Sequence, residues 1–209
     1  MPDTGAMTMQ NPSPDETFAA SSAVEIARLR RSGFVETRHI GSAVVTGPDG
    51  SRLISLGDVD TPIFPRSTLK PFQTIAAMNS GAILSLGQIA IASGSHRADD
   101  DQVAAVRSIL EEAGVAETAL QCPAVGRHRP EEQDSRLFYN CSGKHAAFLA
   151  ACAVNDWDPQ TYLDPQHPLQ QEVLRVIAEV TGEQPSLVGV DGCGAPLAAI
   201  SLSGLGRAY

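Results

Sequence analysis

The sequence predicts a globular protein that combines helices with shorter strands, built as one medium-sized domain or as a domain with an appended piece, and three observations lead to this expectation. Apolar residues make up 43% of the 209 positions, which is enough for a sizeable core. Several stretches combine helical spacing with capping residues. Shorter β-prone runs, bounded by glycine-rich turns, occur before and after these stretches.

The charge balance argues against two classes of partner. Fifteen basic and twenty-four acidic residues give a formal net charge of −9, and the basic residues are scattered except in the short run "RLRR". A nucleic acid or an anionic membrane is therefore not expected as the main partner. No apolar run is long enough to span a bilayer, and the first residues lack the features of a signal peptide. We expect a cytoplasmic protein.

The first half of the chain divides into a tail, a hairpin and helices. Residues 1–22 are rich in Pro, Ser, Thr and Asp without periodic apolar positions, which predicts a disordered tail before a domain at 23–209. Residues 42–58 contain two β-prone runs around "GPDG", which predict a hairpin. Helices are predicted from Ser67 to Gly81, after a capping box of Ser85 and Gln88, and across 99–114.

The second half predicts two more helices and a strand-to-helix turn. "CSGKHAAFLAACAVND" indicates a helix with Ser142 as its N-cap. "HPLQQEVLRVIAEVTG" has Pro168 in the first turn and Gly182 after the last. "SLVGVDGCGAPLAAISLSGLG" then predicts a buried strand, a glycine-rich turn and a helix that starts near Pro196.

Serine and lysine stand three residues apart in "PRSTLKPFQ". Ser67 and Lys70 would share one helical face, where a neutral lysine amine could remove the hydroxyl proton. Lysine serves as such a base only if burial or another cation lowers its pKa. The alternative is a helix-capping serine beside a solvated lysine, because S-x-x-K is common by chance.

A second polar group, "ASGSH", follows an apolar helix. Ser95 and His96 could point into a cleft there, or they could simply cap a loop. If Ser95 lies near Ser67, its hydroxyl could relay a proton or bind substrate.

Four cysteines occur at wide and uneven spacing, at positions 122, 141, 152 and 193, which is not a disulfide framework. Cys141 precedes a helix in "NCSGKHA", where the positive N-terminal potential could make it a thiolate; the alternative is a buried thiol beside a capping serine. Cys193 lies with Asp191 in the turn "GVDGCG", which could equally be only a tight turn. The two cysteines could form an open zinc site with His145 or Lys144 as a third ligand, although no C-x-x-C spacing supports it.

Taken in order, six motifs resemble the asparaginase II family, the Rhizobium etli-type or class 3 L-asparaginases. The motifs are "VETRH", "FPRSTLKPFQ", "ASGSH", "NCSGKHAAFL", "YLDPQHPLQQ" and "GVDGCGAPL". The likeness runs from about Ala23 to the end of the chain. The resemblance implies hydrolysis of L-asparagine to L-aspartate and ammonia, and a homodimer. It also implies an α/β fold with a sheet flanked by helices, similar to serine β-lactamases and glutaminases.

The resemblance also assigns roles to residues. It implies Ser67 as nucleophile or its direct assistant, Lys70 as the base beside it, and Ser95 as the second serine of two Ser-Lys tandems. It implies no organic cofactor and a zinc ion on Cys141, Lys144 and Cys193 that tunes substrate binding. The residues expected to bind substrate are Arg66, His96, Asp191 and Gly192.

Members of this family are appreciably longer than 209 residues. The lysine of the second tandem would lie beyond "GLGRAY", so we expect a C-terminally incomplete fold. The alternatives are a catalytically inactive truncated paralogue that binds zinc or an amino acid, and a β-lactamase-like serine hydrolase. The last lacks its K-T-G and S-D-N elements here.

Overall fold

The computed structural model describes residues 16–127 and 133–209 and shows a mixed α/β protein. Most of the tail predicted for residues 1–22 lies outside the described residues, and its last part forms the short 3-10 helix η1 (Ala20–Ser22). The chain forms two compact units. Of the described residues, the first contains 16–63 and 200–209, and the second contains 64–127 and 133–199.

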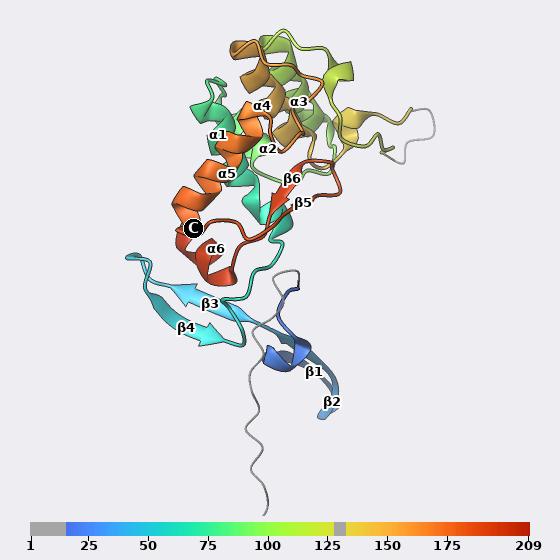
Figure 1. Ribbon diagram of the computed structural model, residues 1–209. Helices are drawn as coiled ribbons and strands as arrows, with labels where there is room; N and C mark the ends of the chain where they lie inside the picture. The colour runs from blue at the N-terminus through green and yellow to red at the C-terminus, as the bar shows by residue number, and fades with distance from the viewer. Residues whose placement is uncertain (1–15, 128–132) are drawn as a thin grey trace, which may run out of the picture. The chain divides into compact units, whose positions relative to one another are not determined.

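The first unit is built on two hairpins (Figure 1). β1 (Val24–Arg31) pairs antiparallel with β2 (Phe34–Gly41), and β3 (Ala43–Thr46) pairs antiparallel with β4 (Arg52–Leu56). The second hairpin confirms the prediction around "GPDG". The first was not predicted, because charged residues such as those of "RLRR" interrupt the alternation that marks a half-buried strand.

Helix α6 (Leu202–Ala208) completes the first unit. It packs against β3, where the Thr46 hydroxyl donates a hydrogen bond to the carbonyl oxygen of Gly206 over 2.8 Å. The side chain of Ser201 caps the helix by accepting from the amide of Gly204.

The second unit is mostly helical, and its helices confirm the sequence predictions closely. The capping box of Ser85 and Gln88 is formed, and Gly182 ends its helix with a left-handed φ of 68°. The elements are η2 (Arg66–Leu69), α1 (Lys70–Asn79), α2 (Leu86–Ala92), α3 (Asp100–Glu112), η3 (Glu117–Ala119), η4 (Arg136–Phe138), α4 (Ser142–Val154) and α5 (Pro168–Thr181).

Helix α4 is the centre of this unit. Every residue from Ser142 to Cys152 is buried, and α1, α2 and α3 all pack against it (Figure 1). The prediction of Ser142 as N-cap is wrong by one position: Cys141 is the N-cap, and the Ser142 hydroxyl donates instead to the carbonyl oxygen of Leu137.

The helix predicted from near Pro196 is wrong. Residues Pro196–Ala198 form strand β6, which pairs antiparallel with β5 (Val188–Val190). All three β6 residues are buried, and the partner strand supplies the hydrogen bonds that a helix would otherwise provide. Across the described residues the strands form three two-stranded sheets.

Within residues 16–127 and 133–209, no helix combines the length and the apolar character needed to cross a membrane.

Candidate active site

Lys70 is the centre of the candidate site. It begins α1, and only 1% of its surface is exposed. Its Nζ donates hydrogen bonds to the carbonyl oxygen of Gly94 at 2.8 Å, to Oγ of Ser95 at 2.9 Å and to the carbonyl oxygen of Asn140 at 3.1 Å. The C-terminal end of α2 and the N-terminal end of α4 therefore meet at one buried amine.

Burial lowers the pKa of Lys70 below its ordinary value, although its interaction with Cys141 partly opposes this shift. A lysine that loses a proton keeps two N–H groups and gains a lone pair. Two of its three partners are carbonyl oxygens, which can only accept, so both N–H groups stay with Gly94 and Asn140. The lone pair of neutral Lys70 is then directed at the hydroxyl of Ser95.

Ser67 lies close to Lys70 along the backbone but is not its side-chain partner. It is exposed on η2, and its carbonyl oxygen accepts from the backbone amide of Lys70. Among the described residues no hydrogen bond joins Oγ of Ser67 to Nζ of Lys70. Of the two serines singled out in the sequence, the structure brings Ser95 to the amine.

His96 is held on both ring nitrogens. Its Nδ1 accepts from the backbone amide of Ala98 at 3.1 Å, so Nε2 carries the proton and donates to Oγ of Ser142 at 2.8 Å. The residue is only 6% exposed. Burial, and then the nearby charge of Lys70, lower the pKa of His96. The ring is therefore neutral, and both of its nitrogens already have hydrogen-bond partners within the protein.

A second buried group contains the two cysteines named above. Nζ of Lys144 donates to Sγ of Cys193 at 3.3 Å. Hydrogen bonding from Cys141 and interactions with His145 and Lys144 lower the pKa of Cys193, against its burial. The pKa of Cys141 is raised. Of the two alternatives left open for Cys141, these pKa directions favour the buried thiol. The favoured thiolate is Cys193, which interacts with Cys141, His145 and Lys144.

His145 supports this group from the core. Its Nδ1 lies 2.6 Å from the hydroxyl of Tyr162, which accepts from the backbone amide of Gln121 and so donates to the ring. Nε2 of His145 then carries the proton; it is buried and has no hydrogen-bond partner of ordinary geometry among the described residues. The imidazole interacts electrostatically with Cys193.

The same group contains the residues that the resemblance assigns to a zinc site. In the part of the chain that the structure describes, no three His, Cys, Asp or Glu side chains lie close enough together to hold a metal ion. Two thiols and Lys144 provide soft donors for zinc, but the lysine would first have to lose its proton. The donor set thus fits a zinc ion only in part.

An ion pair lies beside the glycine-rich turn. The guanidinium of Arg66 and Oδ1 of Asp191 are 2.7 Å apart, and the same oxygen accepts from the backbone amide of Gly192. The hydroxyl of Tyr139 donates to the carbonyl oxygen of Gly192. Arg66 has a φ of 55°, a costly backbone conformation for this residue type.

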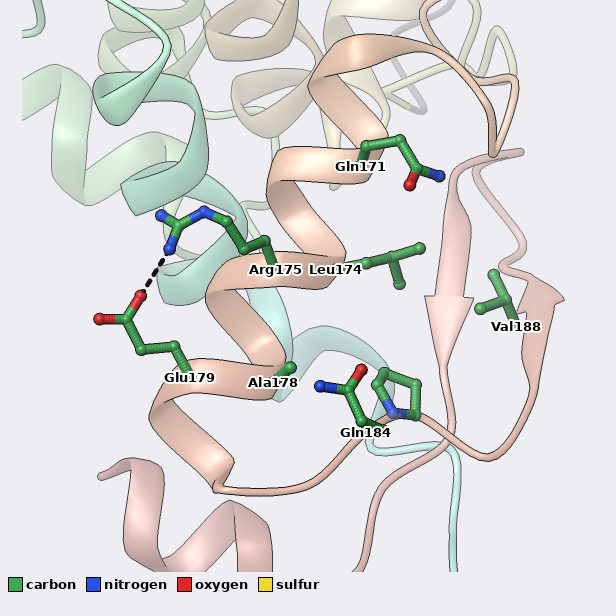
Figure 2. Close-up of a pocket in the computed structure, with 8 residues that line it drawn as sticks. Gln171, Leu174, Arg175, Ala178, Glu179, Gln184 and Val188 are labelled. Carbon is green, nitrogen blue, oxygen red and sulfur yellow. Dashed lines mark hydrogen bonds and ion pairs between the residues drawn. The ribbon is translucent and has the colours of Figure 1, made fainter.

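The hollows on the described part of the second unit include one beside the candidate site and one remote from it. A pocket of about 320 Å³ between α2 and α3 is lined in part by Ser95 and His96. A groove of about 620 Å³ beside α5 is lined by none of the candidate site residues. Figure 2 shows this groove with the ion pair of Arg175 and Glu179 at its edge. The pocket at Ser95 is the one that adjoins the candidate chemistry.

Sequence reasoning missed the carbonyl groups of Gly94 and Asn140 and the hydroxyl groups of Tyr139 and Tyr162. A backbone carbonyl leaves no signal in the residue type, so the first two could not have been found. Tyr139 directly precedes one motif and Tyr162 is the first residue of another, but the partners of their hydroxyl groups lie in other segments of the chain.

Comparison with known proteins identifies a family for most of the chain. The family model of L-asparaginase II matches residues 27–209. Among curated proteins, none matches the chain. The matched segment contains Lys70, Ser95 and the cysteine group. The chain belongs to the L-asparaginase II family.

Proposed function

We propose that this protein hydrolyses L-asparagine to L-aspartate and ammonia through a serine hydroxyl that Lys70 activates. Membership of the family supports an asparaginase-type hydrolase. The observation that carries the mechanism is the contact of 2.9 Å between Nζ of Lys70 and Oγ of Ser95. A desolvated amine whose lone pair is directed at an exposed hydroxyl is a suitable general base.

In this mechanism Lys70 accepts the proton of Ser95. The serine oxygen attacks the side-chain amide carbon, the C–N bond breaks, and the proton returns to the leaving nitrogen to give ammonia. Water then hydrolyses the acyl-serine, with Lys70 again as base. Ser67, which the motif favours as nucleophile, would attack by a second route in which its proton passes through Ser95 to Lys70.

We propose that Arg66 and Asp191 bind the charged ends of the amino acid. A guanidinium suits an α-carboxylate, and a carboxylate suits an α-ammonium. The two side chains pair with each other in the structure, so a zwitterionic ligand could replace that pair with one bond to each. Gly192 would act through its backbone, because its amide positions Asp191.

The first experiment measures ammonia release from L-asparagine by the wild type and by Ser95→Ala, Ser67→Ala and Ser93→Ala. Both routes pass through Ser95, so Ser95→Ala should lose about 10²- to 10⁴-fold in kcat. Ser93 is the C-cap of α2, two residues before Ser95, and its variant should keep wild-type turnover. Wild-type kcat in Ser95→Ala would overturn the proposal.

The covalent adduct separates the two routes. An acid quench of the reaction with L-asparagine, followed by peptide mass spectrometry, locates the aspartyl group. An adduct on Ser95 supports direct attack, and an adduct on Ser67 supports the relay. A turnover-competent wild type without an adduct on either residue would contradict acyl-serine chemistry.

Further features that the resemblance implies belong to the same proposal. Zinc would be held by Cys141, Lys144 and Cys193, as an ion that tunes binding and takes no part in the steps above. The fold would be the β-lactamase-like sheet flanked by helices, and the protein would work in the cytoplasm.

We also propose a homodimer, and exposed apolar side chains on the first unit support it. They follow all four of its strands: Val24, Ile26, Leu29, Phe34, Ile40, Val45, Leu53, Ile54 and Leu56. An isolated two-stranded hairpin is marginally stable in water, so such surfaces favour contact with another sheet or chain. Sedimentation at several protein concentrations tests for the dimer.

A further inference from the structure

His96 is the candidate residue whose surroundings agree least with the role implied by its motif. A substrate-binding histidine needs a free nitrogen at an accessible surface. Here Nδ1 accepts from the backbone amide of Ala98 and Nε2 donates to Oγ of Ser142, so neither nitrogen is free for a ligand, although the residue lines the pocket at Ser95. Ser142 is itself fully buried.

The bonds of His96 connect two elements that hold the reacting groups. His96 directly follows Ser95, while Ser142 lies in the first turn of α4, two residues after Asn140. The backbone amide of His96 also donates to the carbonyl oxygen of Asn140, at 3.3 Å. That carbonyl is one of the two that fix the amine of Lys70.

The hydrogen bonds continue beyond His96 in one direction. Nε2–H of His96 donates to the Ser142 hydroxyl, which donates in turn to the carbonyl oxygen of Leu137 at 2.8 Å. Since the carbonyl oxygen of Leu137 can only accept, the direction of both hydrogen bonds is fixed. The ring therefore has one tautomer and one orientation, and it links the Ser95 loop rigidly to the start of α4.

We propose that His96 is a positioning residue that holds Ser95 on Lys70 through its hydrogen bond to Ser142, and that it does not bind the substrate. This inference rests on the proposed function, because it concerns the base and hydroxyl assigned there. Loss of the link would let the Ser95 loop move away from Lys70, and a misplacement of about 1 Å can cost about 10²-fold in rate.

Three variants separate the two roles. His96→Asn keeps an acceptor near the position of Nδ1 but loses the hydrogen bond to Ser142. His96→Gln can still donate a hydrogen bond from the position of Nε2. Ser142→Ala removes the acceptor of that bond. We expect kcat to fall about 10- to 100-fold in His96→Asn and in Ser142→Ala. The KM for L-asparagine should stay within about twofold of the wild-type value. The double variant of His96→Asn and Ser142→Ala should have a kcat no lower than that of either single variant, because both remove the same hydrogen bond. His96→Gln should recover part of the lost kcat.

His167 provides the matched control. Its Nδ1 also accepts from the backbone amide two residues further on, that of Leu169, but its Nε2 has no hydrogen-bond partner among the described residues. His167→Asn should lose at most stability, with kcat unchanged. A raised KM in His96→Asn, with wild-type kinetics in Ser142→Ala, would overturn the positioning role and make His96 a substrate ligand.

A second readout is independent of turnover. Amide hydrogen exchange followed by mass spectrometry reports the loop at 94–99 and the start of α4. Faster exchange of both segments in Ser142→Ala supports the link even if the wild type does not hydrolyse L-asparagine, and that inactivity would contradict the proposed function alone. Unchanged exchange in both segments would contradict the link.

Discussion

At the scale of single residues, the candidate chemistry depends on what surrounds one buried amine. When Lys70 is charged, each of its three N–H groups has an acceptor. When it is neutral, its two N–H groups donate to the two carbonyl oxygens, and its lone pair accepts from the hydroxyl of Ser95. Both forms are therefore fully hydrogen-bonded, so the proton can move between Lys70 and Ser95 without leaving a buried polar atom unpaired. That property belongs to lysine and not to arginine, whose guanidinium does not give up a proton in proteins.

Lys70→Arg tests this directly. The variant keeps the positive charge and much of the packing but cannot act as a base. We expect kcat for L-asparagine to fall by about 10²- to 10⁴-fold. In the wild type, kcat should rise with pH as Lys70 loses its proton, and the rise should start below the ordinary lysine pKa because burial lowers that of Lys70.

Circular dichroism of the same samples shows whether Lys70→Arg is folded. A folded Lys70→Arg with wild-type turnover and an unchanged pH profile would exclude Lys70 as the base.

At the scale of elements, the site depends on how closely α4 approaches α2. A Cβ atom added to Gly143 would lie 2.4 Å from the carbonyl oxygen of Ile91, at the C-terminal end of α2. Only glycine allows the two backbones to come this close. The same approach places the carbonyls of Gly94 and Asn140 around a single amine.

Gly143→Ala should therefore destabilise the protein although alanine is the better helix former. We expect a loss of about 1 to 3 kcal/mol in the free energy of unfolding, measured with urea, because one of the two helices must shift. Gly87 is the control: it lies exposed in α2, and an added Cβ would meet nothing within 4 Å.

Gly87→Ala should leave stability unchanged or raise it by up to about 1 kcal/mol. Equal and favourable effects of the two alanines would show that α2 and α4 do not meet as described.

At the scale of the whole molecule, three histidines share one electrostatic property. Burial is the largest cause of the lowered pKa of His96, His145 and His167. Each is neutral in the folded chain and accepts a proton more readily when unfolded. In the window between the folded and unfolded pKa values the unfolded chain binds more protons, so stability rises with pH there.

The melting temperature should accordingly fall as the pH drops below the unfolded histidine value of about 6.5. Above that value the stabilisation from neutral histidines is fully present. His167→Asn should weaken this pH dependence, since it removes one of the three groups while an asparagine can still cap α5. A melting temperature that is constant or rises on acidification through this range would contradict the assignment of neutral buried histidines.

The sequence alone determined where most of the helices lie and several of their ends, although the N-cap of α4 differs by one position from the prediction. The capping box at Ser85, the left-handed Gly182 and the "GPDG" hairpin were all predicted, because each depends on residues a few positions apart. Where the outcome depended on distant pairing, prediction failed. Strand β6 was taken for a helix, since its partner strand and not its own residues determines its conformation.

In the candidate site, too, the sequence identified residues from their local motifs, while the contacts between distant segments came only from the tertiary structure. The residue types of "PRSTLKP" and "ASGSH" were sufficient to single out Lys70 and both serines. The sequence placed Lys70 beside Ser67, its neighbour along a helical face. The tertiary structure decided that the amine lies on Ser95, because burial leaves Lys70 no water, and the acceptors that replace it are the carbonyls of Gly94 and Asn140, 24 and 70 residues away along the chain.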